Sequence, residues 1–166
     1  MAEATVRWAR QGDIPDMLRL WKLLASYEGN PPDVVSVSEA QVRRDGFGAE
    51  RRFECLLAEQ DGAVVGLAAF TCAYSTWSGQ SGMFVHDLIL QEEVRGAHLG
   101  QHLMAALAAV ARKRGWQRID LNVRPWNPAR RFYERLPMRH RDDLLIYSMD
   151  AGAIHALAAD VGPIAH

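Results

Sequence analysis

Cysteine, excess charge and long apolar runs are all scarce in this chain of 166 residues. It has only two cysteines, Cys55 and Cys72, and both lie in apolar segments where a free thiol acts as a small hydrophobic side chain. Two cysteines so placed do not make a disulfide scaffold. The formal net charge is −1, which argues against a general nucleic-acid-binding protein, because such proteins carry a basic surplus on one face.

The sequence also lacks segments that direct a chain to a membrane. The first residues, Met-Ala-Glu-Ala-Thr-Val-Arg-Trp, contain no basic region followed by an apolar one. No apolar run reaches the length needed to span a bilayer. We therefore expect a soluble, cytoplasmic protein with neither a membrane partner nor a nucleic-acid partner.

Length and composition fit one ordinary globular domain. Hydrophobic residues make up 49% of the chain and charged residues 23%, a balance that disfavours disorder. No repeat, low-complexity tract or linker divides the sequence. We expect a single domain over residues 1–166, which is long enough for one core and too short for two.

Hydrophobic periodicity predicts a mixed α/β fold. Alternating or short apolar runs predict strands, and apolar residues three or four apart predict helices. The expected strands are residues 6–8, 53–60, 63–74, 83–91, 116–123 and 144–149. The expected helices begin at Asp13, Ser38, Leu99, Asn127 and Asp150. This order implies a mixed sheet with helices on both faces.

Turn and cap residues support these boundaries. Asp61-Gly62, between two apolar runs, is typical of the tight turn of an antiparallel hairpin. Gly115 closes the helix that begins at Leu99. Asn127-Pro128 has the N-cap and first-turn order of a helix start.

The most informative stretch is a strand followed by the turn Arg95-Gly96-Ala97-His98-Leu99-Gly100, which opens a helix. A turn of small residues at a helix N-terminus presents unpaired N–H groups and the positive end of the helix dipole, so it favours a bound phosphate or pyrophosphate. Arg95 adds a charged donor. The alternative interpretation is an ordinary strand-to-helix turn.

This turn resembles the Q/R-x-x-G-x-G/A signature of the GNAT N-acetyltransferase superfamily, and the resemblance extends through nearly the whole chain. Within the superfamily, the sequence is similar to the spermidine/spermine (diamine) acetyltransferase branch. The blocks that carry the resemblance are Tyr27-Glu28, Asp45-Gly46-Phe47-Gly48, Leu57-Ala58-Glu59, Tyr74 with Trp77, Asp87, Trp126-Asn127-Pro128 and Phe132-Tyr133-Glu134. The resemblance implies an α/β GNAT fold with a mixed, mostly antiparallel sheet and helices on both faces, and acetyl transfer from acetyl-CoA.

The resemblance also implies where both substrates bind. The expected acetyl-CoA-binding residues are Leu88, Ile89, Leu90, Arg95, Gly96, Ala97, His98, Leu99, Gly100, Gln101, Asn127 and Tyr133. The expected acceptor-binding residues are Tyr27, Glu28, Trp77, His86 and Asp87. His98 stands where the superfamily usually has its first signature glycine, so the turn must tolerate a side chain there. The spacing from Asn127 to Ala129 is one residue shorter than the usual pattern.

The expected acceptor site has fewer acidic residues than the diamine branch. Ser75 or Thr76 occupies a region where that branch carries an aspartate, and His86 replaces the glutamate before Asp87. Because a polyamine is a multiply charged cation, losing carboxylates weakens its binding. We expect a smaller primary amine, such as a shorter diamine or a lysine-like amino acid, with Glu28 and Asp87 available for charge pairing.

Two residues are candidates for proton transfer. An amine must lose a proton before it attacks a thioester, and His86 is the candidate base because histidine changes charge near neutral pH. Strand alternation places His86 and Asp87 on opposite faces unless a bulge intervenes. Tyr133 is the candidate acid that protonates the CoA thiolate. The alternatives are a structural histidine and a core aromatic residue.

Other interpretations remain open at this point. The acceptor is alternatively a lysine of a peptide or protein, or the chain is a non-catalytic acyl-CoA-binding module. The apolar segment 151–159 is a candidate homodimer interface, since the diamine branch forms homodimers. His98 and His102 lie four residues apart, but no carboxylate or third histidine accompanies them in the sequence, so we expect no metal.

Overall fold

The computed structural model describes residues 4–94, 98–159 and 164. The strands are β1 (Ala4–Trp8), β2 (Glu54–Gln60), β3 (Ala63–Ser75), β4 (Gln80–Leu90) and β5 (Ile119–Leu121). The α-helices are α1 (Ile14–Tyr27), α2 (Glu39–Phe47), α3 (Leu99–Lys113), α4 (Arg130–Glu134) and α5 (Ala151–Ala158), and short 3-10 turns are η1 (Gln11–Asp13), η2 (Pro32–Val34) and η3 (Glu92–Val94). The chain divides into two compact units, Met1–Asn127 and Pro128–His166.

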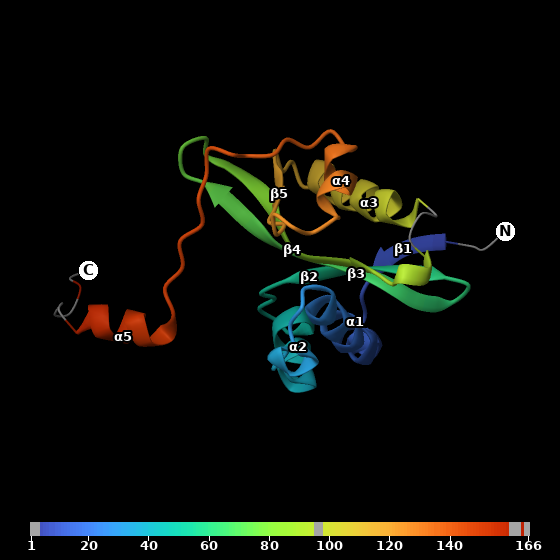
Figure 1. Ribbon diagram of the computed structural model, residues 1–166, viewed down its shortest axis with the longest axis horizontal. Helices are drawn as coiled ribbons and strands as arrows, with labels where there is room; N and C mark the ends of the chain where they lie inside the picture. The colour runs from blue at the N-terminus through green and yellow to red at the C-terminus, as the bar shows by residue number, and fades with distance from the viewer. Residues whose placement is uncertain (1–3, 95–97, 160–163, 165–166) are drawn as a thin grey trace. The chain divides into compact units, whose positions relative to one another are not determined.

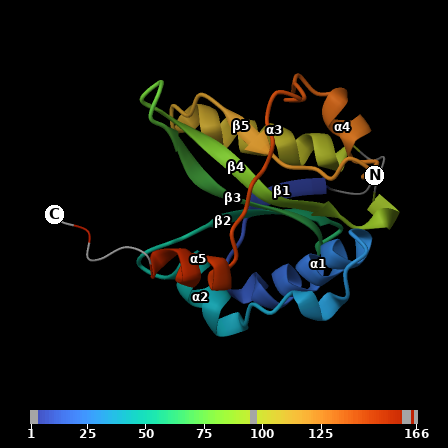
Figure 2. The ribbon, with the colours of Figure 1, turned by 60° about the vertical axis from the view of Figure 1, so that its left-hand side comes forward.

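The first unit is a five-stranded sheet covered by helices on both faces. The strand order is β1-β2-β3-β4-β5, with the first four strands antiparallel and β4 parallel to β5. Helices α1 and α2 lie on one face and α3 lies on the other, as Figures 1 and 2 show. The expectation of a mixed, mostly antiparallel sheet between helices is confirmed.

The core forms where the apolar stripes of the helices meet the sheet. From α1, Ile14, Met17 and Leu20 are fully buried against Leu57 and Leu67 of the hairpin. Burying one such side chain contributes roughly 1.5–3 kcal/mol, so this contact fixes α1 on the sheet. On the other face, Leu99, Leu103 and Leu107 of α3 are buried as the periodicity predicts.

The hairpin between β2 and β3 turns at Asp61-Gly62, as predicted. Both residues have positive φ angles, 52° and 80° respectively. Aspartate tolerates this left-handed conformation better than most residues, and glycine adopts it without a steric penalty. The turn therefore sets the antiparallel pairing of the two central strands.

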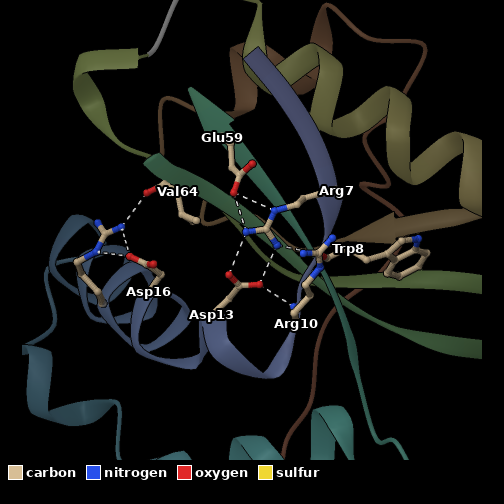
Figure 3. Close-up of polar contacts among 8 residues, drawn as sticks. Arg7, Trp8, Arg10, Asp13, Asp16, Glu59 and Val64 are labelled. Carbon is tan, nitrogen blue, oxygen red and sulfur yellow. Dashed lines mark hydrogen bonds and ion pairs between the residues drawn. The ribbon is translucent and has the colours of Figure 1, made fainter. Parts of the chain in front are cut away.

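Arg7 links β1, β2 and the start of α1 through a half-buried ion network (Figure 3). Its Nη1 and Nη2 donate to the two carboxylate oxygens of Asp13 at 2.8 and 2.9 Å, and its Nε donates to Glu59 Oε1 at 2.8 Å. Asp13 also accepts from the Arg10 N–H at 2.6 Å. Asp13 is the N-cap residue of α1 as expected, but its side chain binds Arg7 and Arg10 and makes no cap hydrogen bond.

Arg114 joins the end of α3 to the N-terminal strands. Its Nη1 and Nη2 donate to Glu54 of β2 at 2.5 and 2.7 Å. The guanidinium carbon also lies 5.5 Å from the ring centroid of Trp8 and 4.9 Å from that of Trp116. Cation–π contacts and a two-pronged ion pair thus hold β1 and β2 to the segment after α3.

Three predicted elements differ in the structure. Strand β5 covers only Ile119–Leu121 of the expected 116–123, because β4 pairs with three residues there. Helix α4 begins at Arg130 with Ala129 as its N-cap, three residues after the expected start at Asn127. Residues 144–149 form no strand in the described part of the second unit, and their apolar side chains are exposed. A β-favouring sequence becomes a strand only when a neighbouring strand satisfies its backbone.

Strand β4 also differs, because it begins at Gln80, three residues before the expected start at Met83. The remaining boundaries agree with the sequence to within two residues. Ser38 caps α2 by accepting a bond from the Gln41 N–H at 3.2 Å. Asp150 caps α5 in the same way through the Ala153 N–H at 2.8 Å. Among the described residues, no helix is both long enough and apolar enough to cross a membrane.

Candidate active site

A β-bulge in β4 brings two polar residues to one side of the sheet. Ala69 of β3 pairs with Asp87, but the next residue, Phe70, pairs with Val85, so His86 is the extra residue. Regular alternation would direct His86 and Asp87 to opposite faces, and a bulge changes the direction of the side chain. As a result, both residues line the same cavity.

This cavity lies within the first unit and has a volume of about 620 Å³. Its polar lining comes from the end of α1, the following loop, β3 and β4: Glu28, Asn30, Thr71, His86 and Asp87. Its apolar lining is Trp21, Leu24, Ala25, Val34, Val35, Val37, Phe53 and Ala69. A small organic molecule that carries charge fits a cavity of this size with a few convergent polar groups.

His86 is held in place by its neighbours on the sheet. Its Nε2 and the Thr71 Oγ1 lie 2.9 Å apart and share a hydrogen bond. Its ring meets that of Phe84 edge-on, with the centroids 4.8 Å apart. The imidazole is exposed, so a ligand in the cavity can reach it while Thr71 and Phe84 fix its orientation.

Asp87 lies deeper in the cavity wall than His86. Burial raises the pKa of Asp87, and the charge of nearby Glu28 raises it further, while His86 and Trp21 oppose the change. Trp21 Nε1 is itself buried and faces this carboxyl group, but no partner lies within normal hydrogen-bonding distance of it among the described residues. Asp87 is thus a largely desolvated carboxyl, and a cation bound beside it would favour its ionised form.

The edge of β4 beyond the bulge has no strand beside it in the described part of the chain. β5 pairs only with Met83, Phe84 and Val85. The Gln91 N–H donates to Val65 O of β3 at 2.9 Å, so by alternation the N–H of Ile89 also points to β3. The N–H group of Leu88 therefore points away from β3, toward the edge that β5 leaves uncovered.

The turn at the start of α3 accommodates a side chain at the position of the first signature glycine. His98 is its N-cap residue and has φ 59° and ψ 2°, in the left-handed region where glycine is favoured. The His102 N–H donates to the His98 O at 2.9 Å, so the N–H groups of Leu99, Gly100 and Gln101 precede the first bond of the helix. The predicted residues Arg95, Gly96 and Ala97 lie outside the described residues.

The other predicted acceptor residues have different positions. Glu28 lines the cavity, and its Oε2 lies 3.3 Å from Arg124 Nε. Tyr27, the last residue of α1, is half-buried and packs against the core outside the cavity lining. Trp77 is fully exposed in the turn between β3 and β4 and does not line the cavity.

Asn127 and Tyr133 fall on either side of the boundary between the two units. Asn127 ends the first unit, where its N–H donates to the Arg124 O at 2.9 Å. Tyr133 lies in α4 of the second unit, with its ring centroid 5.2 Å from that of Phe132. Burial raises the pKa of Tyr133 to about 12, so the phenol keeps its proton at neutral pH.

Sequence reasoning missed two residues of the cavity, Trp21 and Thr71, and also Arg124, which contacts Glu28 but does not line the cavity. Trp21 was expected only as part of an apolar helix face, and Thr71 only as part of a strand. Arg124 drew no attention because its partner Glu28 is distant in the sequence. No group of three or more metal-ligating side chains occurs in residues 4–94, 98–159 and 164.

Comparison with known proteins adds a family. The model of the acetyltransferase (GNAT) family matches residues 17–136. Thialysine N-epsilon-acetyltransferase of Sus scrofa is 35% identical over 135 residues, which cover 76% of this chain and 78% of that protein. Spermidine/spermine N(1)-acetyltransferase-like protein 1 of Homo sapiens is 30% identical over 131 residues, 75% of this chain but 19% of that protein.

Solved structures agree on the fold. An aminoglycoside acetyltransferase from an uncultured soil metagenomic sample superimposes with a TM-score of 0.75 and covers 90% of this chain and 99% of that one. The two sequences are 18% identical, so this likeness speaks for the fold alone.

Proposed function

The chain belongs to the acetyltransferase (GNAT) family, and from this membership we propose that it moves the acetyl group of acetyl-CoA to the primary amine of a small molecule. The acceptor is a diamine, a polyamine or a lysine-like amino acid. Relatives named for thialysine and for spermidine or spermine support this range, since each of these compounds has a primary amine and a second charged group.

The bulge at His86 is the observation that carries the proposal. It puts a candidate base and a half-buried carboxylate, His86 and Asp87, into one cavity of the first unit. Directly beyond them, the N–H group of Leu88 points to the uncovered edge of β4. An amine and a thioester carbonyl need such an arrangement, because the amine must lose a proton while the carbonyl oxygen gains negative charge.

Each residue then has a defined task. Acetyl-CoA supplies the acetyl group as an activated thioester. His86, oriented by Thr71, accepts the proton of the acceptor ammonium directly or through a water molecule. Leu88 donates its N–H group to the carbonyl oxygen as its charge develops. Asp87 pairs with the positive charge of the acceptor and guides the amine to His86.

The phosphates and the leaving thiolate are assigned to other residues. The first-turn N–H groups of Leu99, Gly100 and Gln101 and the positive end of the α3 dipole favour a pyrophosphate. By the family pattern, Arg95, Gly96, Ala97, His98, Ile89, Leu90 and Asn127 complete the acetyl-CoA site. The same pattern assigns Tyr27 and Trp77 to the acceptor, but neither lines the cavity that holds His86 and Asp87. By the family pattern, Tyr133 is the proton donor to the thiolate. Its phenol holds the proton at neutral pH, but a pKa of about 12 makes it a weaker acid than a thiol, so the pKa by itself does not favour the transfer.

Kinetics of CoA release test this function. Purified full-length chain is assayed with acetyl-CoA and a panel of diamines, polyamines, lysine analogues, aminoglycosides and lysine peptides. We expect turnover of at least one small primary amine. Faster turnover of lysine peptides would instead support a protein lysine acetyltransferase. Binding of acetyl-CoA without CoA release for any amine would support a non-catalytic acyl-CoA-binding module.

We further propose that residues 1–166 act as one domain in a cytoplasmic homodimer, without a metal or nucleic-acid partner. Support for self-association comes from the second unit, where Leu145, Ile146 and Tyr147 are 80%, 75% and 88% exposed. An apolar surface of this kind in a chain is typical of an interaction site. Light scattering that gives a monomer mass at all concentrations would remove the dimer from the proposal.

A further inference from the structure

The indole of Trp21 forms part of the cavity wall together with Asp87. Trp21 lies in α1, one turn after the fully buried Met17, and its ring meets that of Phe53 edge-on, with the centroids 6.0 Å apart. Trp21, Phe53 and Asp87 all line the cavity. The ring is therefore held between a helix fixed on the sheet and a second aromatic side chain, and its N–H has a defined direction.

The N–H of this indole is an unsatisfied donor. Nε1 is inaccessible to solvent and has no partner within hydrogen-bonding distance in residues 4–94, 98–159 and 164. A buried donor without a partner costs about 1–3 kcal/mol, and a buried tryptophan usually finds one. Phenylalanine at this position would fill much of the same space without that cost. Packing alone therefore gives no reason for a nitrogen at this point of the wall.

Asp87 is the acceptor that this donor faces. An indole N–H can only donate, and an ionised carboxylate can only accept. A hydrogen bond to an ionised group is about twice as strong as one between neutral groups. The strength of a bond between Trp21 and Asp87 therefore follows the charge of the carboxyl group, and the bond is strongest when a cation in the cavity keeps Asp87 ionised.

Other groups around Asp87 act on its charge in both directions. His86, the preceding residue of β4, favours the ionised form, and Glu28 at the end of α1 disfavours it. Cys55 of β2 is within reach of the same charge, but its thiol stays protonated because burial and Asp87 both raise its pKa. A direct hydrogen bond from Trp21 adds a further stabilisation of the carboxylate that none of these groups supplies.

We propose that Trp21 is the positioning residue for Asp87: its Nε1–H donates to one carboxylate oxygen of the ionised side chain and leaves the other oxygen to the ammonium of the acceptor. With one oxygen held, the carboxylate cannot rotate freely, so the second oxygen keeps one direction into the cavity. The cation is the acceptor amine of the proposed function, on which this role of Trp21 rests, whereas the bond between the two side chains does not depend on turnover.

A positioning role differs from packing in its dependence on pH. A hydrogen bond to the ionised form lowers the pKa of a carboxyl group, so loss of the indole N–H raises the pKa of Asp87. A larger fraction of Asp87 is then protonated at acidic pH and cannot pair with an ammonium. KM for the acceptor should therefore rise more at acidic than at alkaline pH, while kcat is nearly constant because His86 keeps its bond to Thr71.

Two changes at position 21 remove the N–H and keep an aromatic ring. Trp21→Phe leaves a smaller ring that is still able to pack on Phe53. The analogue 3-benzothienylalanine, introduced at position 21 by a suppressor tRNA, has the shape of tryptophan with sulfur in place of the N–H, so it separates loss of the donor from loss of packing. Trp8→Phe is the control, because it removes an indole N–H from β1, outside the cavity lining.

NMR of the full chain measures the bond without any ligand. Carbon-13 shifts of the carboxyl groups between pH 4 and 8 give the pKa of Asp87, whose resonance Asp87→Asn identifies. We expect this pKa to rise by about 1 in both variants at position 21 and to stay constant in Trp8→Phe. The indole N–H signal of Trp21 should move as Asp87 ionises in the wild type and lose this movement in Asp87→Asn.

CoA release with 1,4-diaminobutane and with L-lysine gives the kinetic counterpart. In both variants at position 21, KM for the amine should rise about 3- to 10-fold at pH 6 and less at pH 8.5, with kcat within about twofold of the wild type. KM for acetyl-CoA should be unchanged. Trp8→Phe should match the wild type at both pH values.

An unchanged Asp87 pKa in both variants at position 21 overturns the role of Trp21, and so does an indole signal that does not follow the ionisation of Asp87. A pKa that rises in Trp21→Phe but not with 3-benzothienylalanine also overturns it, since the effect then comes from packing. Absence of CoA release with every amine refutes the proposed function instead, and the NMR titration still decides about Trp21 because it needs no turnover.

Discussion

Thr71 and His86 share a hydrogen bond of 2.9 Å between neighbouring strands at the point where His86 is the extra residue of β4. The bond fixes the position of the His86 side chain at the β-bulge. Without it, the exposed imidazole would have only the edge of Phe84 to restrict its rotation. The orientation of the proposed base thus depends on a residue of another strand.

This dependence predicts a graded effect of two substitutions. His86→Gln is expected to lower kcat about 10²- to 10⁴-fold, as for loss of a general base, with little change in acetyl-CoA affinity. Thr71→Val is expected to lower kcat only several-fold, since it removes the orienting bond and keeps the base. Steady-state kinetics from pH 6 to 9 measure both effects, with Thr5→Val in the exposed strand β1 as the control. Wild-type kcat in His86→Gln would exclude the base role.

Asp87 is expected to contribute to binding at the expense of stability. Burial raises the pKa of this carboxyl, so the folded chain loses stability as pH rises from the unfolded pKa, about 3.9, through the folded value. Asp87→Asn should therefore raise the free energy of unfolding at pH 7 by about 1 kcal/mol, or Tm by about 2–4 °C, and lower activity toward cationic amines. Urea denaturation at pH 4 and pH 7 tests the sign.

The control for Asp87 is Asp33→Asn, which changes an exposed carboxyl of η2. Its stability should follow that of the wild type at both pH values. A lower stability of Asp87→Asn at pH 7 would contradict the assignment of Asp87 as a desolvated carboxylate.

Tyr133 should act as an acid throughout the physiological pH range. Burial raises its pKa to about 12, so a fall in activity between pH 8 and 10 does not come from its ionisation. Tyr133→Phe should lower kcat about 10- to 1,000-fold at constant KM for acetyl-CoA. Tyr147→Phe changes an 88% exposed tyrosine of the same unit and should have no effect. Single-turnover kinetics would reveal a role in product release instead, if the chemical step keeps its wild-type rate.

Replacing His98 with glycine is expected to stabilise the folded chain. A side chain at φ 59° costs roughly 1–2 kcal/mol, part of which glycine gives back through its larger unfolded-state entropy. His98→Gly should thus stabilise the chain by about 0.5–1 kcal/mol, whereas His98→Ala keeps the unfavourable conformation and should not. Thermal unfolding compares the two variants. Equal stabilities of both would indicate that the backbone at this position relaxes freely.

Removing Arg7 from its ion network is expected to destabilise the chain by an amount that depends on pH. Arg7→Met leaves Asp13 and Glu59 half-buried without their cation, which should cost about 1–3 kcal/mol at pH 7. Arg7 lowers the pKa of Asp13, so its contribution is present above the unfolded pKa, about 3.9, and is lost as pH falls through the folded value. The difference between wild type and variant should therefore shrink below pH 4.

Arg19→Met is the matched control for Arg7, because Arg19 forms an exposed pair with Asp16 on α1. It should cost less than about 1 kcal/mol at any pH. Urea unfolding of the two variants separates a half-buried network from a surface pair.

Local chemistry predicted most of the elements correctly. Asp61-Gly62 needs only positive φ angles at two residues to define the hairpin, and the stripe from Leu99 to Leu107 needs only the period of a helix. The predicted helix start at Asn127-Pro128 was wrong because a cap-like pair of residues does not determine whether the chain continues as a helix or as a turn. Residues 144–149 failed because strand formation needs a neighbouring strand, which apolar sequence alone does not provide.

The candidate site was less accessible to sequence reasoning. Alternation predicted that His86 and Asp87 diverge, and only the register of β3 against β4 shows the extra residue between Val85 and Asp87. Likewise, Glu28 and Arg124 become neighbours through the packing of α1 and the loop after β5. Such pairs arise from tertiary geometry, which leaves no local pattern in the sequence.

The contacts of Arg114 with Trp8 and Glu54 can form only late in the synthesis of the chain. Strands β1 and β2 leave the ribosome long before Arg114 and Trp116 are translated. Their contacts with these two residues are therefore absent during that interval. Contacts between residues so far apart in sequence form slowly, because a large loop must close first. We therefore expect the edge strand β1 to reach its native packing late in folding. A nascent chain that stops before Arg114 should expose Trp8 to proteases and chaperones.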